Sequence, residues 1–251
     1  MIQQIHKNTT TIYTPTTIKS NLNLFHLLKT TFLPQSAITK DYYNYQFYDS
    51  LQAFCSTFTN LLANQASIAS LGVGDSSATV QNAASIWILK QGAGMIARIL
   101  FVAMIGNKLD FNSKSWRYIA DILNNISTLL LFLSVHFDRT STIYIFCLAN
   151  ISSCICGVIA NCTKSSLSNH FARSNNIADL NAKDDAQETI INLSTMITGN
   201  YMITKYLKVI SIGYIPFETI LVFSCFMLLH LYCNYLAVKS VVMDFPNIQR
   251  T

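Results

Sequence analysis

The residues best suited to chemistry lie in one polar segment, 179–188, which carries five charges in ten residues directly before a long apolar stretch. If a helix begins in this segment, Asp184 and Glu188 share one face at i and i+4, and Lys183 and Gln187 lie beside them. Such carboxylates at the mouth of a helical bundle could bind a cation or a hydrogen-bonding solute. The alternative is a solvated helix start, where each acid interacts with the helix dipole for about 0.3–1 kcal/mol.

Further ionisable side chains lie near or inside apolar stretches, at Arg98, Asp121, Glu218 and His230. Each is costly there, about 2.5–3.5 kcal/mol for Arg or Asp at a helix centre, so we expect it to pair, snorkel or face water. A structural role is the alternative for all four. Asp75 follows a Gly-Val-Gly break and can cap the next helix. The candidate binding residues are therefore Lys183, Asp184, Gln187, Glu188, Arg98, Asp75 and Asp121.

Two glycines, Gly92 and Gly94, form a loose dinucleotide pattern with Ala97. That motif requires a strand, a tight turn and a helix start, whereas here the glycines lie within a long apolar helix pattern. We therefore interpret both as helix-packing residues. The sequence shows no Ser–His–Asp arrangement, phosphate loop or zinc-ligand spacing, so we expect no enzyme and no metal site, and no cofactor is indicated.

Small side chains also recur every four residues in the stretch between Arg139 and Lys164, where Ala149, Ser153 and Gly157 line one helical face. A face of small residues lets a second helix approach closely. We predict that this face is a helix-packing seam.

The elements that hold these residues are helices with few charges around them. Residues of the AVILMFWYC set make up 51% of the 251 residues, while charged residues make up 12%, about half the usual share of a soluble domain. The clearest apolar run, 140–163, has 24 uncharged residues, enough to cross the roughly 30 Å hydrocarbon core of a bilayer. No alternating pattern is long enough to predict a useful strand. These features predict an all-α, multi-helix membrane-embedded bundle; a soluble bundle with an unusually large core is the alternative.

The chain divides into a flexible, Thr- and Asn-rich tail, 1–31, and a helical membrane domain, 32–251. We expect an amphipathic or buried helix over 48–71. Five spans are expected near 84–104, 119–137, 141–162, 189–204 and 216–237. The lipid bilayer is thus the expected partner. The net charge of +5 comes from scattered basic residues without an aromatic-interleaved stripe, so no nucleic-acid partner is expected.

Several long motifs resemble the Root UVB-sensitive family, whose domain is also catalogued under vitamin B6 photoprotection and homeostasis. They include GVGDSSATVQNAASIWILKQGAGMIARILFVAM, KSWRYIADILNN and NNIADLNAKDDAQETIINL, and the resemblance covers about 32–250. It implies a mostly helical, membrane-associated domain without an established enzymatic activity. In plants, the family is linked to UV-B-sensitive root growth, vitamin B6 homeostasis and auxin transport, and some members are plastid proteins.

Two main functions follow as hypotheses, beside a weaker third, a cofactor enzyme that uses Gly92 and Gly94. The first is a non-enzymatic membrane protein that moves or senses a small solute, related to vitamin B6 or auxin by the resemblance. The alternative is a membrane scaffold that binds partner proteins, such as other family members or a second copy of this chain. The sequence places the protein at a membrane and leaves the organelle open.

Overall fold

The computed structural model describes residues 3–6, 9–12, 24–34, 37–72, 80–109, 111–174, 176–208 and 210–242. The chain divides into two compact units, Met1–Leu33 and Pro34–Thr251. The division falls close to residue 31, where the sequence changes in composition. The flexibility of the N-terminal tail stays a prediction.

The N-terminal unit contains a small hairpin and one helix. Strand β1 (Gln3–His6) pairs antiparallel with β2 (Thr9–Ile12), and α1 covers Leu24–Phe32. The sequence pattern did not predict these strands, because each has only four residues. Threonine favours the extended backbone, which accounts for β2.

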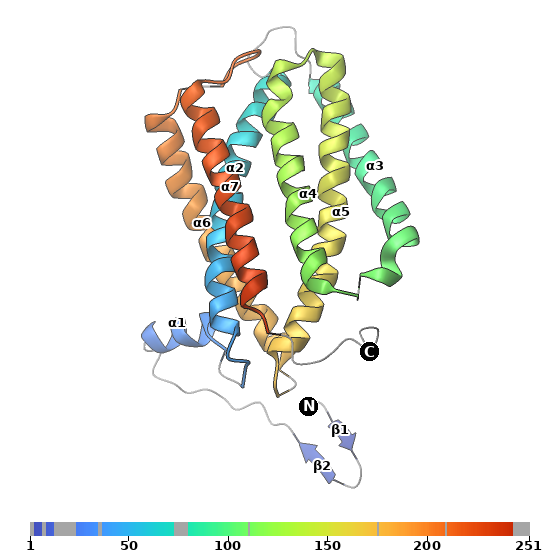
Figure 1. The fold of residues 1–251 in the computed structure, drawn as a ribbon, viewed down its shortest axis with the longest axis vertical. Helices are drawn as coiled ribbons and strands as arrows, with labels where there is room; N and C mark the ends of the chain where they lie inside the picture. Colours follow the sequence, from blue (N-terminus) through green and yellow to red (C-terminus); the bar gives the residue numbers. More distant parts are fainter. Residues whose placement is uncertain are drawn as a thin grey trace. The chain divides into compact units, whose positions relative to one another are not determined.

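The second unit is a bundle of six long helices, as predicted for an all-α domain. They are α2 (Tyr42–Ser70), α3 (Val80–Ile105), α4 (Ser113–Leu133), α5 (Arg139–Phe171), α6 (Ile177–Tyr206) and α7 (Phe217–Ser240). Successive helices run in alternating directions (Figure 1). Helix α2 confirms the helix expected over 48–71; it packs along α4, α6 and α7, while α3 packs mainly on α5.

Local signals at the helix ends explain these turns. The Asp138 carboxylate accepts hydrogen bonds from the Thr140 and Ser141 amides at the start of α5, at 3.1 and 3.2 Å. Gly72 and Gly213 adopt φ values of 77° and 76°, which a residue with a Cβ adopts only with strain. At the second of these turns the Gly213 amide donates to the Val135 carbonyl at 2.8 Å, which ties the α6–α7 connection to the end of α4.

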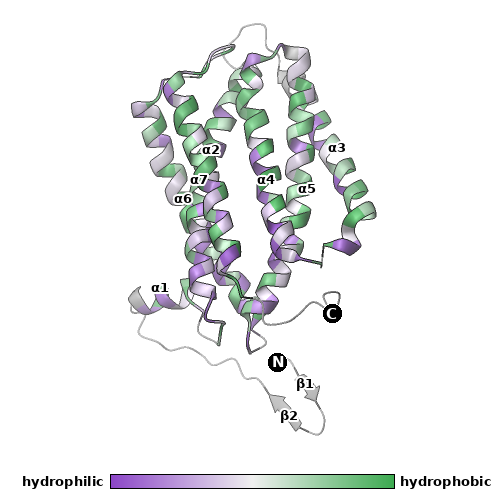
Figure 2. Ribbon diagram, viewed as in Figure 1, coloured by the Kyte–Doolittle hydropathy of each residue, from purple (hydrophilic) through white to green (hydrophobic). Residues whose placement is uncertain are grey.

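An apolar core fills the half of the bundle where α2 and α4 end. The Phe132 and Phe223 rings stack with centroids 3.9 Å apart, and the Phe58 and Phe226 rings stack at 4.4 Å. Phe58, Phe132 and Phe223 are each 1% exposed. The opposite half is richer in hydrophilic residues (Figure 2).

Within the described residues, four helices are long and apolar enough to cross a membrane: Ala84–Lys108, Ser113–His136, Thr140–Phe171 and Phe217–Ser240. They coincide with four of the five expected spans. The fifth, 189–204, lies within α6, where Asn192, Thr198 and Asn200 interrupt the apolar run, and α6 is not among the four.

The outer helix surfaces are strongly apolar. Of the residues in the most apolar 18-residue stretch of α3, only 6% are buried in the bundle. The side chains of Ile88 and Met104 are 74% and 75% exposed. Such a surface suits lipid and is unfavourable in water, so it argues against the soluble alternative. The fold is therefore that of a membrane-embedded helical bundle.

Candidate functional site

A polar cavity of about 310 Å³ lies between five helices of the bundle. It occupies the half of the bundle where α2 and α4 begin. The charged and imidazole side chains that line it are Asp49 of α2, Arg117 and Asp121 of α4, Lys164 of α5, Asp184 and Glu188 of α6, and His230 of α7.

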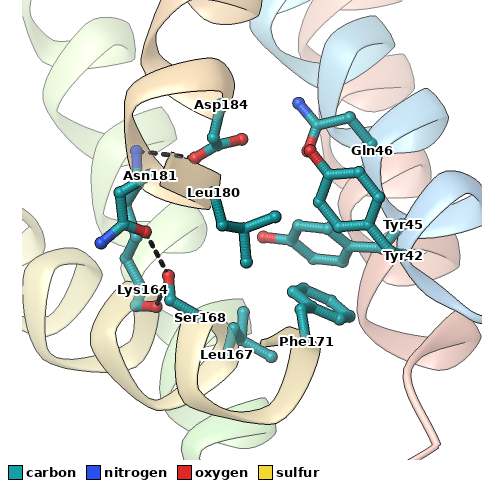
Figure 3. Close-up of a pocket in the computed structure, with 10 residues that line it drawn as sticks. All are labelled: Tyr42, Tyr45, Gln46, Lys164, Leu167, Ser168, Phe171, Leu180, Asn181 and Asp184. Carbon is teal, nitrogen blue, oxygen red and sulfur yellow. Dashed lines mark hydrogen bonds and ion pairs between the residues drawn. The ribbon is translucent and has the colours of Figure 1, made fainter. Parts of the chain in front are cut away.

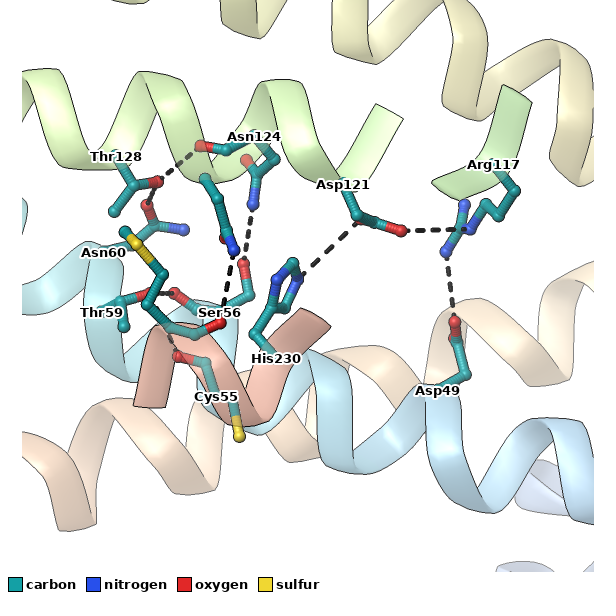
Figure 4. Close-up of polar contacts among 12 residues, drawn as sticks. Asp49, Cys55, Ser56, Thr59, Asn60, Arg117, Asp121, Asn124, Thr128 and His230 are labelled. Carbon is teal, nitrogen blue, oxygen red and sulfur yellow. Dashed lines mark hydrogen bonds and ion pairs between the residues drawn. The ribbon is translucent and has the colours of Figure 1, made fainter. Parts of the chain in front are cut away.

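A chain of charged contacts crosses one wall of this cavity (Figure 4). Arg117 Nη2 lies 3.1 Å from Asp49 Oδ1, and Arg117 Nε lies 3.8 Å from Asp121 Oδ2. Asp121 Oδ1 in turn lies 3.9 Å from His230 Nε2. One guanidinium therefore serves two carboxylates.

Helical periodicity explains why these side chains meet. On α2, Tyr45, Asp49, Gln52 and Ser56 recur at intervals of four, three and four residues, so they share one face. Arg117, Asp121, Asn124 and Thr128 follow the same spacing on α4. The two polar stripes face each other along most of their length.

Two neutral hydrogen bonds continue the contact between the stripes. Asn124 donates its side-chain amide to Ser56 Oγ at 3.2 Å. One turn further along α4, the Thr128 hydroxyl donates to Asn60 Oδ1 at 3.0 Å. These bonds fix the register of α2 against α4, and therefore the position of Asp49 against Arg117.

Lys164 forms the opposite wall, where α5 approaches α6. Its ammonium lies 2.7 Å from Asp184 Oδ2 and 2.6 Å from Asp185 Oδ1. One turn along α5, Ser168 donates a hydrogen bond to Asn181 Oδ1 at 2.5 Å (Figure 3). These contacts hold the first turns of α6 against α5.

A second, much smaller pocket adjoins this wall and shares Tyr45, Lys164 and Asp184 with the main cavity. Figure 3 shows the rings of Tyr42, Tyr45 and Phe171 on its other side. Its volume of about 20 Å³ leaves room for one water molecule. Of these two pockets, the larger one has room for a solute.

Several polar atoms in the main cavity have no hydrogen-bond partner among the described residues. They are Gln52 Oε1, Arg117 Nε, Asp121 Oδ2 and His230 Nδ1. Gln52 and His230 are 5% and 1% exposed. Buried polar atoms are almost always hydrogen-bonded to protein, water or ligand, so we expect this cavity to hold water or a polar ligand.

The predicted binding residues divide into three groups. Asp121, Asp184 and Glu188 come together in the cavity. Lys183 is directed elsewhere, to Asp179 at 2.6 Å, and neither it nor Gln187 is among the lining residues.

The other predicted binding residues do not reach the cavity. Arg98 is exposed on α3, which contributes no lining residue. Asp75 lies outside the described residues.

The predicted helix-packing residues also differ in their surroundings. A Cβ added at Gly94 would overlap Asn150 Nδ2, so α3 and α5 approach closely there. Ala149 of the same region is fully buried.

Ser153 is exposed, however, and a Cβ added at Gly157 or Gly92 would meet no atom within 4 Å. The contact with α3 falls instead on Asn150 and Cys154, one residue further along the chain than the predicted seam at Ala149 and Ser153. Asn150 donates to the Lys90 carbonyl of α3 at 2.9 Å, which fixes this register.

Four charged or imidazole groups of the cavity were not among the predicted binding residues: Asp49, Arg117, Lys164 and His230. Asp49 and Lys164 stand at the edges of apolar runs, where a charge usually marks only a helix end. The repeated polar spacing on 45–56 and 117–128 is the signal that could have found Asp49 and Arg117.

Asp41, which lies outside the four candidate spans, ties together three helix ends. Its Oδ2 lies 2.9 Å from His170 Nε2 at the end of α5 and accepts a hydrogen bond from the Val242 amide after α7 at 2.8 Å. Burial alone favours the neutral acid, but hydrogen bonds from neighbours including Val242 and His170 lower the pKa of Asp41 below its ordinary value. Asp41 thus closes the end of the bundle next to the cavity.

Within the part of the chain that the structure describes, no group of three or more His, Cys, Asp or Glu side chains could hold a metal ion. Gly92 and Gly94 lie in the interior of α3, which is no place for a phosphate-binding turn. The site can bind through charge and hydrogen bonds from its side chains.

Comparison with known proteins agrees with the sequence motifs. Residues 18–251 match the Vitamin B6 photo-protection and homoeostasis domain. The chain is 44% identical to RUS family member 1 of Dictyostelium discoideum over 242 residues, which cover 93% of this chain and 44% of that protein. It is 35% identical to Protein root UVB sensitive 3 of Arabidopsis thaliana over 224 residues, covering 88% of this chain and 49% of that protein.

The chain spans about half the length of these relatives. No solved structure matches it significantly. The domain match over most of the chain, together with these two relatives, means that the chain belongs to the Root UVB-sensitive family.

Proposed function

We propose that this protein is an integral membrane protein that binds a small polar solute in the cavity between α2, α4, α5, α6 and α7, in order to move or sense it. It performs no covalent chemistry on the solute. The observation that carries the proposal is a charged cavity with unpartnered buried polar atoms, lined by five helices of which α4, α5 and α7 are long and apolar enough to cross a membrane.

The energetic argument concerns the cost of such a cavity. A buried ion pair brings little net stability, because the desolvation of both ions offsets their attraction. Ionisable groups among membrane helices are rare, and they typically mark pathways for solutes or ions. Seven charged or imidazole groups line one cavity, four of them on the candidate spans α4, α5 and α7, and they therefore support a binding role better than a structural one.

The size of the cavity supports a small solute. Its volume of about 310 Å³ lies at the lower limit of the usual range for ligand sites, about 300–1,000 Å³. The family description names vitamin B6 homoeostasis, so we propose the B6 vitamers as the first solutes to test. Each is a single substituted pyridine ring, which a cavity of this volume can enclose.

The test is solute binding by the detergent-purified chain and solute uptake by vesicles that contain it. We expect purified protein to retain a small molecule that mass spectrometry detects after denaturation. Asp121→Asn, which alters the cavity, should lose this molecule while the protein still folds. Glu218→Gln is the matched control. Glu218 lies at the start of α7, where it pairs with the exposed Lys208, and it does not line the cavity.

The same experiment separates the scaffold hypothesis. A protein that retains no solute and supports no uptake, yet purifies with another family member or as a stable oligomer, would contradict the proposed function in favour of the scaffold.

A further inference from the structure

The charges around the cavity do not balance. Four carboxylates line it, from Asp49, Asp121, Asp184 and Glu188, against two cationic groups, from Arg117 and Lys164. With all four carboxylates ionised and His230 neutral, the lining carries two negative charges in excess.

Both cations are already shared between carboxylates. Arg117 faces Asp49 and Asp121, and Lys164 contacts Asp185 as well as Asp184. Neither cation is therefore free to neutralise a further anion. An anionic solute would have to compete with these carboxylates and would also meet the excess negative charge.

Among the described residues, Glu188 is the one carboxylate of the cavity lining that has no ion pair. It lines the cavity and interacts electrostatically with the cations Lys164 and Arg117 as well as with the carboxylates of Asp49 and Asp184, but none of these contacts is an ion pair. Its side chain is exposed on the cavity rim. A carboxylate in this position attracts a cation into the cavity.

The unpartnered atoms favour the same kind of ligand. Gln52 Oε1 and Asp121 Oδ2 are acceptors. His230 Nδ1 is an acceptor too when the ring proton is on Nε2, the nitrogen that faces Asp121. Arg117 Nε is the one donor among these four atoms. A ligand that satisfies three acceptors must donate several hydrogen bonds, as an ammonium group does with three N–H donors.

We propose that the cavity binds a small organic cation, a protonated amine whose N–H groups donate to Gln52, Asp121 and His230 while Glu188 supplies the counter-charge at the rim. This inference rests on the proposed solute-binding function. It selects amines over neutral alcohols of the same skeleton and over phosphate esters.

The experiment measures binding of matched probes to the detergent-purified full chain at pH 7. Pyridoxamine and pyridoxine share one ring skeleton and differ in an aminomethyl against a hydroxymethyl group, while pyridoxamine 5′-phosphate adds the phosphate. Ethanolamine and phosphoethanolamine form a second amine and phosphate pair without the ring. We expect the free amine of each pair to bind at least tenfold more tightly than its phosphate ester, and pyridoxamine at least tenfold more tightly than pyridoxine.

Two single variants then locate the charge. Glu188→Gln should weaken pyridoxamine binding at least fivefold and leave pyridoxine binding unchanged, because only the amine gains from the carboxylate charge. Glu218→Gln removes a carboxylate far from the cavity and should change neither.

The outcomes are separable. Tighter binding of a phosphate ester than of its free amine, or unchanged pyridoxamine affinity in Glu188→Gln, overturns the cation inference and leaves the proposed function standing. If none of the probes binds and purified protein retains no small molecule, the proposed function fails and the inference fails with it.

Discussion

The half of the bundle around Phe132 and the half around Arg117 share several helices but have opposite chemistry. Helices α2, α4 and α7 contribute stacked aromatic rings to the first half and charged or imidazole groups to the second. The first half is closely packed, whereas the second encloses a cavity with unpartnered polar atoms. The same three helices thus hold a packed core and a binding cavity at different levels.

This difference indicates which half of the bundle stabilises the fold. Close packing in the aromatic half fixes the helices relative to one another. The charged half can then keep buried groups that are costly by themselves, as functional sites commonly do. This division predicts that substitutions in the aromatic half change stability, whereas selected substitutions in the charged half change binding at small cost.

The largest effect is expected at Arg117, where the two halves differ most. Arg117→Gln leaves Asp49 and Asp121 without their shared cation, and uncompensated buried charges of this kind cost about 3–5 kcal/mol. Asp49→Asn should cost much less, because it leaves one carboxylate for one guanidinium. The free energy of unfolding in mixed micelles, measured by SDS titration, compares the two variants.

A double variant tests the same stoichiometry. Arg117→Gln combined with Asp49→Asn should be more stable than Arg117→Gln alone. Equal losses in the two single variants would show that Arg117 does not serve two carboxylates.

The next largest effect is expected at Phe132, which stacks on Phe223 and is 1% exposed. Phe132→Ala should lower the free energy of unfolding by about 3 kcal/mol, near the low end for large-to-small core substitutions. The value is low because detergent, not water, surrounds the unfolded helices, so the loss comes mainly from packing contacts. SDS titration measures it, and the folded fraction should bind solute as the unsubstituted protein does.

Loss of solute binding in folded Phe132→Ala protein would break the comparison. It would mean that the aromatic half acts on the cavity directly, and not only by holding the helices.

Much of the aromatic half could be predicted from sequence, since long apolar runs with helical spacing determine the helices and their outer faces. Less of the charged half could be predicted. Asp121, Asp184 and Glu188 were recognised because each lies in or beside an apolar run. Asp49 and Lys164 could not be assigned to the cavity in this way, because their roles depend on which helix faces which.

The helix-packing residues show the same limit in another form. A stripe of small residues predicts that a helix can be approached closely, but it does not say which partner comes or in which register. At Gly94 the approach occurs, because Asn150 bonds to the backbone of α3 and brings the helices together. At Gly157 the same small size meets open space, because α3 packs on a neighbouring face of α5.

Two glycine-to-alanine substitutions test the packing of the bundle, and we expect them to change its stability in opposite directions. A methyl group added at Gly199 of α6 would lie 2.9 Å from Leu61 Cδ1 and 3.2 Å from Phe58 Cδ2, in the aromatic half. Gly199→Ala should therefore destabilise the protein by about 1–3 kcal/mol through overpacking.

Gly157→Ala meets no atom and should stabilise α5 by about 0.5–1 kcal/mol, since alanine loses less backbone entropy in a helix. Thermal melting in detergent should separate the two by sign, and a stabilising Gly199→Ala would contradict the close packing assigned to that half.

The smallest effect concerns Asp41, which closes the charged end of the bundle. Asp41→Asn keeps the side-chain shape but removes the charge that His170 and the Val242 amide contact, so we expect a loss of about 1 kcal/mol at pH 7, the usual net value of one hydrogen bond.

Because the pKa of Asp41 in the folded protein lies below its ordinary value of 3.8, its charge stabilises the fold above that value. This contribution is lost as the pH falls through the lowered pKa, where the folded carboxylate takes up its proton. The difference in melting temperature between the unsubstituted protein and Asp41→Asn should therefore shrink as the pH falls below about 4. If the two proteins melt at the same temperature at every pH from 7 to 3, Asp41 acts through its shape, which Asn keeps, and the charged end is closed by packing, as the aromatic half is.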